Sequence, residues 1–196
     1  MTELFPIVLF TISSSLTPGP NNFMLMSSGL HFGIKKSLPH YFGICLGFFA
    51  MVLIIALGLG AVFMESLWLK QALKILGSAY MLYLAFQILT AHTKPKAAHA
   101  AKPLSFIQAV LFQWVNPKAW LMAVGAISIF TLSDHYLTNA VLISTMFLLA
   151  FIPCGAVWLL FGKFLQKILK EDKHRLWFNV AMAICLVASI ALIFFD

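Results

Sequence analysis

Two short polar motifs contain the residues of this sequence that are best suited to bind a small molecule. They are Thr17-Pro18-Gly19-Pro20-Asn21-Asn22 and Asn116-Pro117-Lys118. Each interrupts an apolar stretch long enough to cross a bilayer. Because proline has no backbone N–H to donate four residues back, each motif predicts a broken helix. In hydrocarbon, broken backbone is tolerated only where it is buried in protein or lines a polar cavity.

Lys118 is a charged side chain inside an apolar stretch, too far from either end of the predicted span to reach the interface. Leaving it unpaired in hydrocarbon would cost at least ~2.5 kcal/mol. Asn116 followed by Pro117 is typical of an N-cap and a first helical position, which places Lys118 in the first turn of a new half-helix. The lysine and the positive end of the helix dipole both favour an anion here.

No acidic residue of the apolar stretches is available to be that anion. All six lie outside the predicted spans or at their ends: Glu3, Glu65, Asp134, Glu171, Asp172 and Asp196. We therefore expect a substrate carboxylate near Lys118. The alternative is structural: the lysine donates to carbonyls freed by the first break, near Ser14 or Leu16, and locks the two parts together. Binding or coupling is the favoured interpretation, and exchange of the lysine's proton would provide coupling without a membrane carboxylate.

The first motif complements the second. The amides of Asn21 and Asn22 both donate and accept hydrogen bonds, and the uncapped carbonyls of the outer half-helix would receive a substrate ammonium. Together the two breaks predict a site for a zwitterion near the membrane midplane. The alternative is a packing feature that binds no ligand. We expect no cofactor and no catalytic residue.

The composition excludes a soluble globular domain. Of the 196 residues, 62% are apolar and 10% are charged. We predict an all-α polytopic membrane protein with six transmembrane helices, of which the first and fourth are broken. The predicted spans are residues 4–29, 41–64, 71–90, 104–130, 138–162 and 176–195. The first lacks the basic region and cleavage site of a secretory signal, so we expect it to be retained.

The cations behind the net charge of +7 lie mainly in predicted loops, and this distribution does not indicate nucleic-acid binding. Ten of the thirteen cations lie in alternate loops, 30–40, 91–103 and 163–175. By the positive-inside rule these loops are cytoplasmic and both termini face outward.

A single transport domain is expected to fill residues 1–196, as two half-repeats of about 1–90 and 104–196 joined by a cytoplasmic linker, about 91–103. Because each half has three spans, the second would be inverted relative to the first. Sliding Pro20 onto Pro117, a shift of 97 residues, overlays the spans in order. We therefore predict a 3+3 inverted repeat.

Other chemistries have little support. Cys45, Cys154 and Cys185 lie in predicted spans with no C-x-x-C pair, and the histidines are expected in loops or at helix ends, which argues against a metal or redox site. The chain offers no nucleophile with a partner base, so an enzyme is not expected. An ion or metal exporter and a non-transporting membrane subunit remain the alternatives to an amino-acid transporter.

The motifs resemble the LysE/RhtB family of bacterial amino-acid exporters. The resemblance rests on Thr17–Pro20, the glycine-rich stretch Gly29–Gly47, the segment Leu73–Leu84, and Asn116–Ala119, in this order and spacing. It implies a compact six-helix exporter of the bacterial inner membrane, a secondary transporter driven by the proton gradient as an antiporter, and leaves a homodimer open. No partner beyond the substrate and the lipid bilayer is implied.

The Pro-Gly-Pro-Asn-Asn form and the short length are most similar to the branch that exports cysteine and O-acetylserine. Related branches export homoserine, threonine, leucine or lysine. A dibasic substrate would need a buried carboxylate for its side chain, which the predicted spans lack. Small neutral amino acids, of the cysteine/O-acetylserine or homoserine/threonine type, are therefore favoured.

Overall fold

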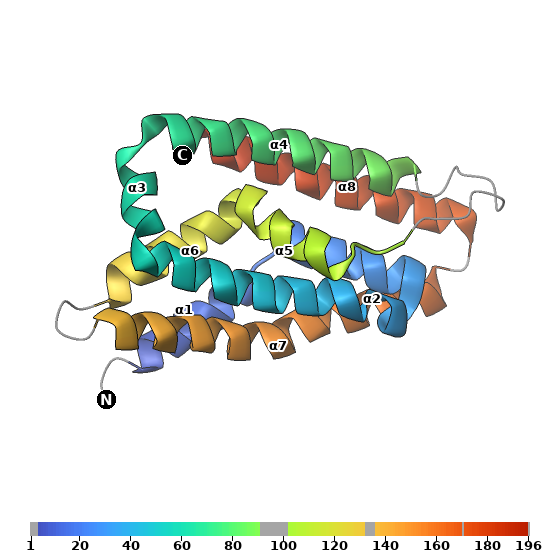
Figure 1. Ribbon diagram of the computed structural model, residues 1–196. Coiled ribbons are helices and arrows are strands. Elements are labelled where there is room, and N and C mark those ends of the chain that lie inside the picture. Colours follow the sequence, from blue (N-terminus) through green and yellow to red (C-terminus); the bar gives the residue numbers. More distant parts are fainter. Residues whose placement is uncertain (1–3, 91–101, 132–135, 170, 196) are drawn as a thin grey trace.

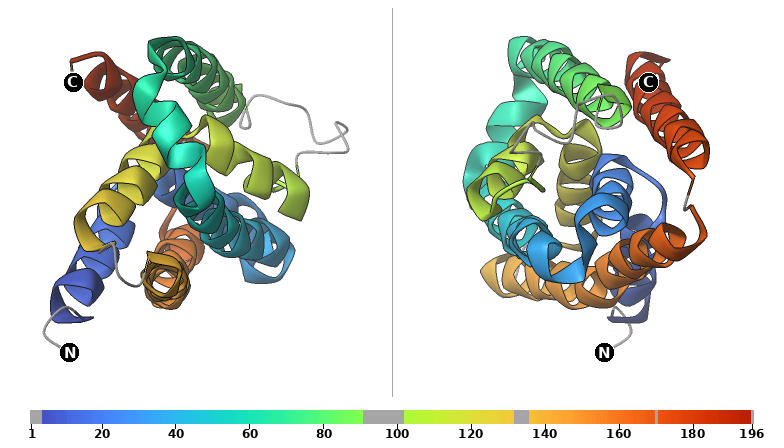
Figure 2. Two further views of the ribbon diagram at one scale, coloured as in Figure 1. Left: turned by 60° about the vertical axis from the view of Figure 1, so that its left-hand side comes forward. Right: turned by 90° about the vertical axis from the view of Figure 1, so that its right-hand side faces the viewer.

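The computed structural model describes residues 4–90, 102–131, 136–169 and 171–195, and this part of the chain is all-α, as predicted. Figure 1 shows long helices lying roughly along one direction, with α2 (Pro20–Ile54) and α7 (Tyr136–Ile168) on one side. Helices α4 (Leu67–Thr90) and α8 (Asp172–Phe195) form a second pair on the other side. Helices α5 (Phe106–Val115) and α6 (Pro117–Phe130) lie between these two pairs, whereas α1 (Leu4–Leu16) packs against α7 (Figure 2).

The predicted break in the first span is confirmed. Helix α1 (Leu4–Leu16) ends before the motif, and α2 begins at Pro20. Gly19 between them is fully extended, with φ −178°. Pro20 occupies the first position of α2, where its missing N–H removes no helical bond. The polar motif thus separates two helices inside one predicted span.

The chain turns sharply at Gly33, inside the predicted loop 30–40. Gly33 has φ 74°, which glycine adopts without steric cost, and the residues on both sides are helical. A straight helix would separate Ser28 and His40 by ~18 Å, yet Ser28 Oγ and His40 Nδ1 are 2.9 Å apart. Figure 1 shows the second arm of α2 returning past the first. The loop prediction was therefore too long, because one glycine makes the reversal.

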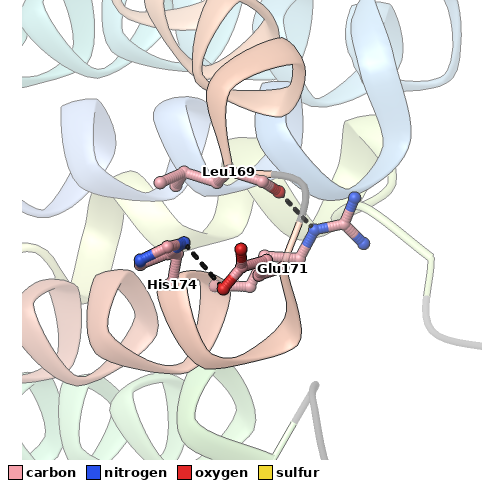
Figure 3. A network of polar contacts seen from close by, with 4 residues as sticks. Leu169, Glu171 and His174 are labelled. Carbon is pink, nitrogen blue, oxygen red and sulfur yellow. Dashed lines mark hydrogen bonds and ion pairs between the residues drawn. The ribbon is translucent and has the colours of Figure 1, made fainter.

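The loop predicted at 163–175 is also mostly helical. Helix α7 continues to Ile168 and α8 begins at Asp172. Lysine is a good helix former, so the basic residues extend the helices instead of ending them. At the junction, Arg175 Nε donates to the Leu169 carbonyl at 2.9 Å, and His174 Nδ1 lies 3.7 Å from Glu171 Oε2 (Figure 3).

The second predicted span, 41–64, is not one regular helix. After Ile54 the chain forms a π-helical turn, η1 (Ile55–Leu59), in which Gly58 has φ 121°. Helix α3 (Gly60–Glu65) then crosses toward α4 (Figure 1). The linker predicted at 91–103 lies largely outside the described residues.

The fourth predicted span is broken as expected. Helix α5 (Phe106–Val115) starts at a capping box in which Ser105 Oγ accepts from the Gln108 N–H. Asn116 leaves the helical conformation, with φ −90° and ψ 104°, and α6 (Pro117–Phe130) begins with Pro117 in its first turn. Helix α7 contains Pro153.

Glycines let the helices approach closely. Gly29 and Gly162 bring α2 and α7 together, since a Cβ on Gly162 would overlap the Met26 carbonyl. Gly43 and Gly47 face α5, where a Cβ on Gly47 would lie 2.8 Å from Val110 Cα. Gly43 and Gly47 form a G-x-x-x-G pair, a pattern typical of closely packed membrane helices.

Three helical stretches are long and apolar enough to cross a membrane: Pro20–Phe63, Leu67–Thr90 and Tyr136–Ile168. Large apolar side chains also point outward, among them Phe5, which is 75% exposed, and Trp68, which is 72% exposed. Such a surface needs lipid around it. The broken helices α1, α5 and α6 are shorter than a span, so each crosses only part of the hydrocarbon.

Candidate binding site at the two helix breaks

Lys118 joins the two breaks, which lie about a hundred residues apart in the sequence. Its Nζ donates to the Thr17 carbonyl at 2.5 Å and to the Pro18 carbonyl at 3.2 Å. Lys118 lies in the first turn of α6, as predicted. The structural alternative for this lysine is therefore formed, on carbonyls just after the two that were expected. These bonds leave one of its three N–H groups for another partner.

Gly19 packs directly against this lysine. A Cβ added at Gly19 would lie 2.7 Å from Lys118 Cδ and 3.1 Å from Nζ. Any larger residue would push the lysine away from the carbonyls that it bridges. The glycine of the first motif thus makes room for the cation of the second.

Asn22 satisfies the end of the broken helix α1. Its side chain is 3% exposed, and Nδ2 donates to the Ser15 carbonyl at 3.0 Å and to the Thr17 carbonyl at 2.8 Å. These carbonyls have no helical N–H partner because α1 ends at Leu16. Thr17 Oγ1 also turns back, to the Ser13 carbonyl, so Thr17 offers the site its carbonyl and not its hydroxyl.

Asn21 pairs with a residue that sequence reasoning missed. Its Nδ2 donates to Gln113 Oε1 at 2.8 Å, and Gln113 Nε2 donates back to Asn21 Oδ1 at 3.2 Å. Gln113 is fully buried and also donates to the Ala109 carbonyl. The signal was a glutamine in an apolar stretch shortly before the second break. This pair fixes the start of α2 against α5.

Asn116 occupies the N-cap position of α6 as predicted, but its side chain makes no capping bond. The residue is 2% exposed, and its Oδ1 has no partner among the described residues. Its backbone is satisfied, since the N–H donates to the Gln113 carbonyl and the carbonyl accepts from Ala119. Gly77 of α4 packs against this break, where a Cβ would lie 3.2 Å from Pro117 Cγ.

These groups line a small pocket. Its walls are Ser14, Ser15, Gly19, Asn21, Asn22, Phe48, Asn116, Lys118, Ala119, Met122 and Phe151. The free volume inside is about 20 Å³, enough for about one water molecule. Of the predicted site residues, Gly19, Asn21, Asn22, Asn116 and Lys118 line this pocket. Thr17 and Pro18 border it through the carbonyls that Lys118 binds, whereas Pro20 and Pro117 start its helices.

One histidine departs from expectation. His40 lies inside α2, only 1% exposed, with Nδ1 beside Ser28 Oγ and no partner for Nε2 among the described residues. It was assigned to a loop because of the polar residues around it. No group of three or more potential metal ligands occurs in the part of the chain that the structure describes.

Broken helices that meet at a polar pocket inside an apolar helical assembly are typical of membrane transporters. Residues 12–195 match the sequence profile of the LysE type translocators, and the chain belongs to that family. It is therefore a multi-pass membrane translocator and not an enzyme, as the resemblance implied.

Relatives of this chain include a cysteine/O-acetylserine efflux protein of Escherichia coli strain K12, 32% identical over 95% of this chain and 94% of the relative. The protein of the same name from Shigella flexneri has the same identity and coverage. No solved structure matches this chain.

Proposed function

We propose that this protein exports small neutral amino acids or their derivatives from the bacterial cytoplasm, with cysteine and O-acetylserine as the first candidates. Relatives named for that activity align over 95% of the chain. The observation that carries the proposal is Lys118, a cation held between two broken helices at the wall of a polar pocket.

The substrate carboxylate binds the free N–H of Lys118. Two of its N–H groups are bonded to carbonyls, and no carboxylate of the described residues pairs with it. The N-terminal end of α6 adds a positive potential at the same point. A carboxylate arriving here gains a charge-assisted hydrogen bond, whereas the carbonyls that Lys118 now contacts offer only neutral acceptors.

Transport requires a wider state than the one described. A free volume of about 20 Å³ does not hold an amino acid. We infer that α1 or α6 moves at the two breaks to make room for the substrate. When Lys118 turns to the substrate, it releases the Thr17 and Pro18 carbonyls and loosens the contact between the two breaks.

The proposed topology keeps the sequence predictions. Six spans form a 3+3 inverted repeat, with both termini outside and the basic loops in the cytoplasm. The start of a helix at Pro20 and at Pro117 supports the repeat. Export is coupled to proton entry as an antiport, with Lys118 as the group that exchanges the proton, and the site lies near the midplane.

The pocket favours neutral side chains. Phe48, Met122 and Phe151 form its apolar wall, and no acidic residue lines it. A second cation, as on lysine, would therefore meet no opposite charge. This supports cysteine, O-acetylserine or threonine over dibasic substrates.

The test is uptake of labelled cysteine, O-acetylserine, threonine, leucine and lysine into inside-out vesicles, with and without a proton gradient. We expect gradient-dependent uptake of a neutral amino acid, reduced at least ~100-fold by Lys118→Ala, since a transition-state charge contact of roughly 3 kcal/mol is lost. Insertion and folding of the variant are checked by chromatography in detergent. Absence of uptake by folded wild-type protein would overturn the proposal and favour an ion exporter or a non-transporting subunit.

A further inference from the structure

Two buried acceptor atoms in the pocket have no partner inside the described protein. Ser15 is 3% exposed and Asn116 is 2% exposed, and both line the pocket. Neither Ser15 Oγ nor Asn116 Oδ1 makes a hydrogen bond to any described residue. Buried polar atoms are bonded in the great majority of cases, so two orphans in one small pocket require an explanation.

The neighbouring polar groups are already occupied. Ser14 Oγ donates to the Phe10 carbonyl at 2.6 Å. The Thr17 carbonyl accepts from both Asn22 and Lys118. Three carbonyls at the first break, those of Ser15, Thr17 and Pro18, therefore already accept hydrogen bonds within the protein. Within the pocket, Ser15 Oγ and Asn116 Oδ1 are acceptors that remain open for a substrate ammonium.

We propose that Asn116 Oδ1 and Ser15 Oγ accept the hydrogen bonds of the substrate ammonium, while Lys118 binds the substrate carboxylate. This inference rests on the proposed function. An ammonium has three donors and no acceptor, which suits two oxygen acceptors that lack donors. Asn116 comes from the second break and Ser15 from the end of α1. An amino acid thus bridges the same two parts that Lys118 joins in the described state.

This assignment makes the site selective for α-amino acids. A pocket built to hydrogen-bond a substrate group rejects analogues that lack the group, because its own polar atoms then stay unpaired. A carboxylic acid without the ammonium, such as 3-mercaptopropionate, leaves both acceptors empty. Cysteamine, which lacks the carboxylate, leaves Lys118 on its carbonyls.

The first experiment measures how these analogues compete with labelled cysteine for uptake. For Ser15→Ala and Asn116→Leu we expect cysteine to bind about tenfold more weakly, with the affinity for 3-mercaptopropionate unchanged. Ser13→Ala is the matched control: Ser13 lies on the same turn, its hydroxyl donates to the Phe10 carbonyl, and it is outside the pocket. Equal weakening of cysteine and 3-mercaptopropionate in both variants would overturn the assignment.

The second experiment needs no transport. Without substrate, Ser15→Ala removes an unpaired buried hydroxyl and should raise the melting temperature, whereas Ser14→Ala removes a bonded hydroxyl and should lower it. If Ser15→Ala destabilises as much as Ser14→Ala, the Ser15 hydroxyl has a partner in the resting protein and the inference fails. Uptake of cysteine by the wild type in the same preparation tests the proposed function separately.

Discussion

The two helix breaks are alike in sequence and different in how their polar groups are used. Both place a proline in the first turn of a new helix, at Pro20 and at Pro117. The first break frees carbonyls, and Asn22 and Lys118 bind them. At the second break the backbone N–H and carbonyl of Asn116 are bonded, yet its side-chain oxygen has no partner among the described residues.

This difference separates a structural half of the site from a binding half. At the first break the Ser15, Thr17 and Pro18 carbonyls are bound from within the protein, so its backbone holds its shape and only the Ser15 hydroxyl stays open. The second carries the cation, the helix dipole and an open acceptor, so it has capacity for a ligand. Lys118 belongs to both, because it satisfies the first break in the described state and is the cation available to a substrate carboxylate. The balance between these two uses sets the proposed transport cycle.

After the loss of Lys118 itself, the largest effect is expected where the two breaks touch. Gly19→Ala places a methyl group 2.7 Å from Lys118 Cδ and should displace the lysine from its carbonyls. We expect uptake of the preferred substrate to fall about tenfold or more, since small misplacements of binding groups have large costs.

Gly125→Ala is the control for this change. Gly125 lies in α6, and an added Cβ there meets no atom within 4 Å. Alanine is also the better helix former, so uptake and stability should be unchanged or slightly improved. Equal losses in both variants would show that glycine flexibility, and not the room for Lys118, matters at position 19.

What the sequence predicted here depended on local rules. Proline lacks an N–H wherever it occurs, so both breaks and the first-turn position of Lys118 followed from the residues alone. The reversal at Gly33 was hidden, because the polar residues of 30–40 indicated a loop although they are compatible with helix.

The polar pairings could not be predicted from the sequence for another reason. Asn21 and Gln113 are 92 residues apart, and only tertiary packing brings them together. The same holds for the carbonyls of the first break: local pattern showed that they lose their partners, but not that Asn22 and Lys118 replace them. The open acceptors on Ser15 and Asn116 emerge only after these bonds are assigned.

A measurement of unfolding free energy tests the structural role of Asn22 at the first break. Asn22→Leu leaves the Ser15 carbonyl without its side-chain donor, while the Thr17 carbonyl retains Lys118. We expect a loss of about 2 kcal/mol in unfolding free energy, the cost of one orphaned buried acceptor plus a lost bond. Thermal unfolding in detergent measures it. Thr17→Val, which removes an exposed hydroxyl, should cost far less, and a similar loss in both would argue against the role of Asn22.

The smallest effect concerns the link between the breaks through Asn21 and Gln113. Single changes to leucine each leave the partner amide without its reciprocal bonds, whereas the double change removes both amides. The double variant should therefore be more stable than the sum of the two losses predicts, by about 0.6 kcal/mol, the usual size of an interhelical bond in membranes. A double-mutant cycle of unfolding free energies measures this coupling. Strict additivity would mean that the pair adds nothing to the contact between α2 and α5, and that Lys118 alone connects the two breaks.

If Lys118 were the only connection, its release to a substrate would leave the two breaks free to separate, and transport should become faster in the double variant. With coupling present, the amide pair holds the breaks in register while the lysine changes partner.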